Sequence, residues 1–154
     1  MTTLFTVSVL FTVRGLPKAQ PRVKAFRRGA HAGVYTPGSA SQWKDLVVFA
    51  ARAHRPPSPL DGPLSVSIDF LMPRPKSRMR KRDPSGEIPS SAKPDRDNLE
   101  KAVLDALTQD GWWRDDAQVC AGEVRKLYHA KGAAPGARIA IRAVSESDDN
   151  PNHT

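Results

Sequence analysis

The chain has 154 residues, of which 39% are hydrophobic and 26% are charged, a composition typical of one globular domain. Its 24 Lys and Arg residues outnumber its 16 Asp and Glu residues and give a net charge of +8, which favours a polyanionic partner. Charge alone leaves DNA, RNA and an anionic membrane open as that partner.

The cysteine, histidine and hydrophobic patterns exclude several classes of site. The single cysteine, Cys120, rules out an intrachain disulfide and a cysteine-based zinc site, and the histidines lack metal-ligand spacing. Residues 3–13 alternate and lack the basic start of a signal peptide, and no run approaches the ~18 apolar residues of a membrane span. On this evidence we expect a cytoplasmic protein. Because no amphipathic helix carries the basic residues, we expect no membrane partner.

A strand and a basic segment open the chain. Thr3–Arg14 places β-branched and apolar residues at a period near two, which predicts a strand. Residues 15–38 contain prolines and glycines and no acid, which predicts a basic arm along DNA phosphates, with a solvated hairpin as the alternative. Phe26 or Tyr35 is available to stack on an unpaired base. The candidate DNA contacts in this segment are Lys18, Arg22, Lys24 and Arg27.

A helix, a strand and a second basic segment follow. Ser39 or Ser41 is expected to cap a helix that runs to about His54. Leu64 to Met72 is the clearest half-buried strand, with Asp69 solvated on its polar face. Residues 73–92 are rich in Pro, Ser and charge, which predicts a flexible loop that clamps the DNA backbone; a merely solvated loop is the alternative. The candidate DNA contacts in and just after this loop are Arg74, Lys76, Arg78 and Lys93.

The acids of this basic chain gather around one predicted helix. Apolar residues at helical spacing predict a helix over about 98–110, with Asp97 as its N-cap, Glu100 as the capping-box partner and Gly111 closing its end. Asp95 lies two residues before Asp97, so extended geometry points both carboxylates the same way. Asp115 and Asp116 follow the helix, and they lie close to Asp95 and Asp97 only if the next strand runs back beside the strand that carries Asp95.

A cluster of these carboxylates requires a compensating cation, and oxygen ligands of this kind suit Mg²⁺, with Mn²⁺ also possible. Lys101 lies one turn into the helix from Asp97 and is placed to offset charge on a phosphate. Each acid alone has a simpler explanation, since Asp97 is a common helix cap and Asp115-Asp116 an ordinary turn. The combination with Lys101 favours a metal site.

The remaining elements complete an α+β fold, with a mixed β-sheet and two main helices packed on one face. Trp112 and Trp113 are either core anchors or wedges against bases, and we expect at least one to be buried. Val119 to Tyr128 and Arg138 to Val144 predict the last two strands. Residues 1–144 form a single domain, and the polar tail, 145–154, is expected to be disordered.

The stretch from Asp95 to Leu107, with Asp97-Asn98-Leu99 and Lys101-Ala102, together with Gly111 to Val119, resembles the RusA family of Holliday-junction resolvases. The match is ungapped over about 25 residues, and the N-terminal half resembles phage-type members through Gly15-Leu16-Pro17-Lys18. The resemblance places three metal-binding acids on Asp95, Asp97 and Asp116 and the catalytic lysine on Lys101. It implies a homodimer of phage or prophage origin that resolves four-way DNA junctions by paired, Mg²⁺-dependent nicks.

Two other functions stay open at this point. A less selective nuclease acting on flaps or other branched DNA would use the same acids. A metal-independent protein that binds branched DNA would carry them only as structural residues.

Overall fold

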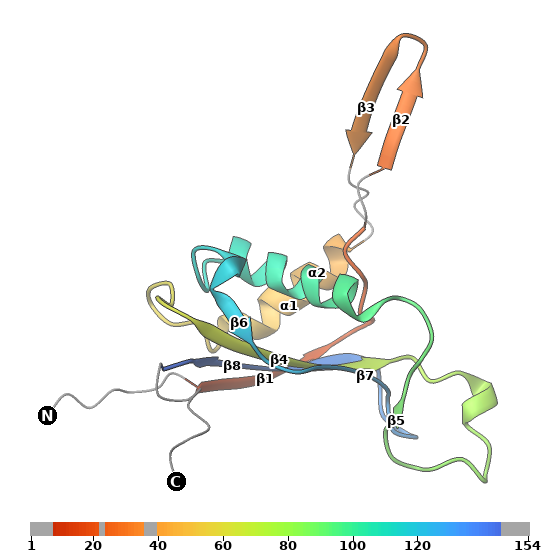
Figure 1. Cartoon of the computed structure of the whole chain (residues 1–154). Helices are drawn as coiled ribbons and strands as arrows, with labels where there is room; N and C mark the ends of the chain where they lie inside the picture. The colour runs from red at the N-terminus through yellow and green to blue at the C-terminus, as the bar shows by residue number, and fades with distance from the viewer. Residues whose placement is uncertain (1–7, 22–23, 36–39, 146–154) are drawn as a thin grey trace, which may run out of the picture.

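In the computed structural model, which describes residues 8–21, 24–35 and 40–145, a mixed six-stranded sheet carries both long helices on one face (Figure 1). β4 runs antiparallel to β8 and parallel to β6 and β7, and the β1–β8 and β5–β7 pairs are antiparallel. The predicted α+β fold with a mixed sheet is therefore confirmed. The strands are β1 (Ser8–Arg14), β4 (Leu64–Met72), β5 (Ile88–Pro89), β6 (Val119–Ala121), β7 (Val124–Tyr128) and β8 (Gly136–Ala143).

The core lies between the sheet and the two helices, α1 (Ser41–Arg52) and α2 (Arg96–Gln109). Alternate residues of the central strand β4 point into it, and each helix adds an apolar stripe at helical spacing. Fully burying one such side chain stabilises the fold by about 1.5–3 kcal/mol. Fully buried core residues include Trp43, Val47, Ile68, Phe70, Leu99, Val103, Leu107, Trp112 and Trp113.

α2 begins two residues earlier than predicted, so the assignment of Asp97 as N-cap with Glu100 as its partner is wrong. Asp95 is the N-cap, with extended backbone, and its carbonyl accepts the first helical hydrogen bond from the Leu99 N–H at 3.2 Å. Asp97 is the second helical residue, where an acid is favoured by the positive end of the helix dipole. The apolar residues keep the same helical spacing whether the helix begins at residue 96 or at residue 98, so their pattern does not show where it begins.

Gly111 closes α2 as predicted. Its φ of +85° is a left-handed conformation that glycine adopts without strain. Its N–H donates to the Thr108 carbonyl and the Trp112 N–H to the Leu107 carbonyl, both at 3.1 Å, which is the Schellman pattern at a helix end. The turn delivers Trp112 and Trp113 directly into the core, where both are buried. The Trp113 Nε1–H donates to Thr108 Oγ1 at 2.7 Å.

Residues 73–92, predicted as a flexible basic loop, are organised around one buried guanidinium. Arg74 is 7% exposed and donates to the carbonyls of Arg78, Pro84, Gly86 and His129 at 2.6–3.5 Å. The segment also contains the short 3₁₀ helix η1 (Lys76–Arg78) and strand β5, which pairs with β7. The hydrogen bonds of Arg74 hold this polar segment together. Because its guanidinium is buried and already hydrogen-bonded, Arg74 is withdrawn from the candidate DNA contacts.

β2 (Lys24–Arg28) and β3 (His31–Tyr35) pair with each other in a separate two-stranded sheet. Figure 1 shows this hairpin projecting from the side of the sheet that carries the helices. Residues 24–35 thus form a hairpin, which was the alternative to a basic arm along DNA, and the contact of this segment with DNA stays a prediction. Arg22, which belongs to the same prediction, lies outside the described residues, as do positions 146–154 of the predicted disordered tail.

The predicted strand from Val119 to Tyr128 is split into β6 and β7 at Gly122. A Cβ at Gly122 would lie 1.9 Å from the Val66 carbonyl oxygen, so only glycine lets the two backbones approach here. In the part of the chain that the structure describes, no helix is long and apolar enough to cross a membrane.

Candidate functional site

Two of the predicted acids lie at the exposed start of α2. Asp95 precedes the helix and Asp97 lies within its first turn, so the extended geometry expected to align their side chains stops at Asp95. The Asp95 side chain is 47% exposed, and its Oδ1 lies 3.6 Å from the Nζ of Lys93. Both carboxylates are thus open to a ligand from solvent, beside a helix N-terminus that itself attracts anions.

Lys101 lies one helical turn after Asp97, as predicted, and is exposed on α2. Its Nζ is 3.6 Å from Oδ1 of Asp105, another turn along. Asp105 is also 4.0 Å from the Nζ of Lys44 on α1. Because the Lys101 side chain is 58% exposed, this ion pair is weak, and the ammonium group is available to a stronger anion such as a phosphate.

Asp116 opens the short 3₁₀ helix η2 (Asp116–Gln118), and Asp115 is its N-cap. Asp115 Oδ1 accepts from the Ala117 N–H at 2.8 Å, while Gln118 Oε1 accepts from the Asp115 N–H at 3.2 Å. Gln118 also donates through Nε2 to the Leu60 and Gly62 carbonyls, each at 3.0 Å. Asp115 therefore builds the turn that presents the half-buried Asp116.

The expected cluster of acids does not form within one chain. Among the described residues, no three Asp, Glu, His or Cys side chains are grouped closely enough to hold a metal ion. Asp116 lies just before β6, whose Val119 pairs with Leu64 at the start of β4. Asp95 follows Pro94, whose carbonyl accepts a hydrogen bond from Lys126, and Lys126 pairs with Phe70 near the other end of β4. Leu64 and Phe70 are about 20 Å apart along β4 at roughly 3.3 Å per residue, which separates Asp116 from the start of α2.

Comparison with known proteins assigns the chain to a family. The family model described as Endodeoxyribonuclease RusA matches residues 14–142. The chain belongs to the RusA endodeoxyribonuclease family. That match spans the start of α2, Lys101 and η2, and therefore includes every residue predicted for catalysis.

The relatives of this chain differ in how much of it they match. The Bacillus subtilis protein YqaN, named as uncharacterized, is 32% identical over 142 residues, which are 89% of this chain and 97% of YqaN. The crossover junction endodeoxyribonuclease RusA of Escherichia coli K12 is 49% identical over 45 residues, 29% of this chain and 38% of that enzyme. The crossover junction endodeoxyribonuclease of Enterobacteria phage 82 matches to the same extent.

The remaining candidate DNA contacts of this RusA-family chain lie in several places. Lys18, Arg27, Lys76, Arg78 and Lys93 have exposed side chains, in contrast to Arg74. Lys24 lies on β2. Lys18 and Lys93 approach the same cavity, beside the start of α2, and the other three lie in the hairpin and in η1.

A charged network on β4 was not predicted, because Asp69 was expected to be solvated. Asp69 instead accepts from Arg125 at 2.7 and 2.8 Å and from Arg138, whose guanidinium also donates to Glu87. Hydrogen bonding to Arg125 lowers the pKa of Asp69, and hydrogen bonding to Arg138 lowers the pKa of Glu87. Arg125 and Arg138 are the register neighbours of Asp69 on the two flanking strands, a relationship that only the sheet topology reveals.

Proposed function

We propose that this RusA-family protein is an endonuclease that resolves four-way DNA junctions by paired phosphodiester hydrolysis, in DNA recombination and repair in the cytoplasm of a bacterial cell. The observation that carries the proposal is the exposed constellation of Asp95, Asp97 and Lys101 at the start of α2, within the family match. The net charge of +8 supports a DNA partner. The crossover junction name of the Escherichia coli relative supports a branched substrate.

We further propose that Asp95, Asp97 and Asp116 hold Mg²⁺, or Mn²⁺ in its place. Their carboxylate oxygens are the ligands these hard cations prefer, and the exposure of the first two admits both metal and phosphate. A bound Mg²⁺ supplies an activated water and offsets charge on the leaving oxygen. Lys101 exchanges Asp105 for a phosphate oxygen and stabilises the charge that develops there during cleavage.

The separation of Asp116 from Asp95 and Asp97 supports a homodimer as the active form. We propose that a second copy supplies Asp116 to the acids at the start of α2. A two-fold dimer then carries two sites related by the same symmetry as a four-way junction, which accounts for paired nicks.

The experiment compares a labelled four-way junction with a linear duplex of the same arm sequence, in Mg²⁺ or in EDTA. Wild type is expected to nick the junction in pairs only with Mg²⁺, and Asp97→Asn is expected to bind the junction without cutting it. Asp61→Asn, an exposed acid outside the site, is the matched control and should cut normally. Cutting of both substrates would instead identify a less selective nuclease.

A non-catalytic protein that binds branched DNA is the second candidate. It is favoured by one observation, that no three potential metal ligands are grouped among the described residues. This candidate predicts tight junction binding without cleavage in Mg²⁺ or Mn²⁺, and equal behaviour of wild type and Asp97→Asn.

A further inference from the structure

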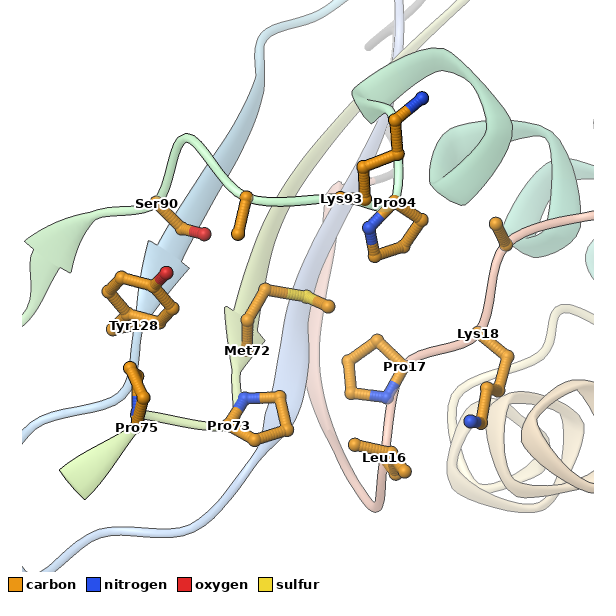
Figure 2. A pocket seen from close by; sticks show the side chains of 12 residues that line it. Leu16, Pro17, Lys18, Met72, Pro73, Pro75, Ser90, Lys93, Pro94 and Tyr128 are labelled. Atoms are coloured by element: carbon orange, nitrogen blue, oxygen red, sulfur yellow. The ribbon is translucent and has the colours of Figure 1, made fainter. Parts of the chain in front are cut away.

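A cavity of about 690 Å³ opens between residues 16–19, which follow β1, and residues 90–94, which lead into α2. Figure 2 shows side chains from both segments, and from the ends of β4 and β7, arranged around it. Its size falls within the roughly 300–1,000 Å³ of pockets that enclose small organic ligands. Its main walls are Pro17, Met72, Pro73, Pro75, Pro94 and Tyr128.

The lining selects a flat, uncharged ligand joined to an anion. The proline rings and the Tyr128 ring offer apolar faces, and the hydroxyl groups of Tyr128 and Ser90 are the side-chain hydrogen-bonding groups among the uncharged lining residues. Lys18 and Lys93 are the charged residues in the lining, and none of the described residues around the cavity is acidic. In Figure 2 the Lys93 ammonium points away from the middle of the cavity, as expected for a group that meets a phosphate outside it.

Hydrogen bonds fix both walls of the cavity to the start of α2. The Lys126 ammonium donates to the carbonyls of Ala92 and Pro94, the latter at 2.7 Å. On the opposite wall, the Gln20 N–H donates to the Asn98 carbonyl at 2.9 Å. A ligand in the cavity is therefore held at a fixed position beside Asp95 and Asp97, and the pocket requires little reorganisation before it binds.

We propose that this cavity receives one DNA base, turned out of the stack next to the phosphate that is cut. The base lies among the ring faces of Tyr128 and the prolines, and Lys18 and Lys93 bind the phosphates on either side of it. This inference rests on the proposed function. Turning out a base costs least where it is unpaired or poorly stacked, as at a branch point, so the cavity contributes to selection of branched over linear DNA.

The test places the fluorescent base 2-aminopurine singly at each position flanking the branch point of a four-way junction, in EDTA so that the DNA stays intact. Binding of wild-type protein is expected to raise the emission several-fold at one position, because the base leaves the stack. Ala92→Trp fills the cavity and should abolish this rise. Ser91→Trp, an exposed neighbour outside the lining, is the matched control and should retain it.

An abasic site at the responding position provides a second measurement. It should weaken wild-type binding about tenfold, the loss expected for one stacked base. It should leave the affinity of Ala92→Trp unchanged, because the filled cavity has no base to lose. Thermal unfolding of both tryptophan variants at the wild-type temperature confirms that the comparison is between folded proteins.

The outcomes separate this inference from the proposed function. The base-binding cavity is ruled out if wild type binds and cuts junctions but the emission rises at no position, or if Ala92→Trp shows the same rise as Ser91→Trp. Either result leaves the proposed nuclease function unaffected. The cavity then takes another ligand, such as a segment of a partner protein. If wild type neither binds nor cuts junctions, both proposals are overturned.

Discussion

Arg138 on β8 donates through Nη2 to Oδ2 of Asp69 on β4 at 3.2 Å, and the two residues face each other in the sheet register. Arg125 faces Asp69 from β7 on the other side. A carboxylate between two guanidinium groups has its pKa lowered, chiefly by the hydrogen bonds from Arg125. The charged form of Asp69 thus contributes to the stability of the central strand, and that contribution depends on pH.

Asp69→Asn is expected to lower the free energy of unfolding by about 1 kcal/mol at neutral pH, the range of a well-formed but partly exposed ion pair. Because the folded-state pKa is below the ordinary value of 3.8, the contribution is complete above that value and disappears as the pH falls through the folded-state pKa. Urea unfolding at neutral and acidic pH should show the two proteins converging in acid. Asp61→Asn, which is exposed, should match wild type at neutral pH.

Arg74→Lys is expected to destabilise the chain by about 2–3 kcal/mol, because one ammonium group cannot reach all the carbonyls that the buried, planar guanidinium serves and leaves some of these part-buried acceptors unpaired. Residues 76–86 should also become sensitive to limited proteolysis. The control, Lys76→Ala, removes an exposed cation of the same segment and should leave the unfolding temperature unchanged. Equal effects of the two variants would show that the hydrogen bonds of Arg74 do not hold this segment.

A comparison of Gly122→Ala with Gly111→Ala separates the free-energy cost of a steric clash from the cost of a backbone conformation with positive φ. Both glycines have positive φ, +127° and +85°, but a Cβ at Gly122 collides with the Val66 backbone while one at Gly111 meets open space. We expect about 1 kcal/mol of destabilisation for Gly111→Ala and at least about 3 kcal/mol for Gly122→Ala. Chemical denaturation measures both, and similar values would contradict the close β6–β4 approach.

Mixing two inactive variants tests whether the acids of one site come from two chains. If Asp116 acts in the partner's site, a dimer of Asp97→Asn and Asp116→Asn chains has one doubly altered site and one intact site. Random exchange makes half of the dimers mixed, so about a quarter of wild-type nicking should return. Each variant alone is the control. No recovery despite verified exchange would show that each site takes its acids from one chain.

The elements that bury apolar surface were predictable from sequence, because burial of one face requires apolar residues to recur at the spacing of a strand or a helix. The alternation in β4 and the stripes of α1 and α2 were found for this reason. β5 has two residues, one of them Pro89, and exists only because β7 pairs with it, so it left no pattern. The charge of Arg74 was counted correctly, but its carbonyl partners lie up to 55 residues away, and composition does not show where a guanidinium points.

The candidate site was predictable in its residues but not in its assembly. The short spacing of Asp95, Asp97 and Lys101 is local, and the structure keeps it in one helix start. The position of Asp116 depends on the register of β6 against β4, which no local signal sets. For the same reason Asp69 was taken as solvated, since its partners Arg125 and Arg138 are 56 and 69 residues away.

The parallel pairing of β4 with β7 has a consequence for refolding. Parallel neighbours need a long connection, and here residues 73–123 form it, carrying Asp95, Asp97, Lys101 and Asp116. Helices α1 and α2 form through local contacts, whereas β7 docks on β4 only after this connection closes, and such long-range closures are slow. On dilution from denaturant, helical circular dichroism should therefore recover first, and DNA cleavage should return no sooner than the slowest folding phase.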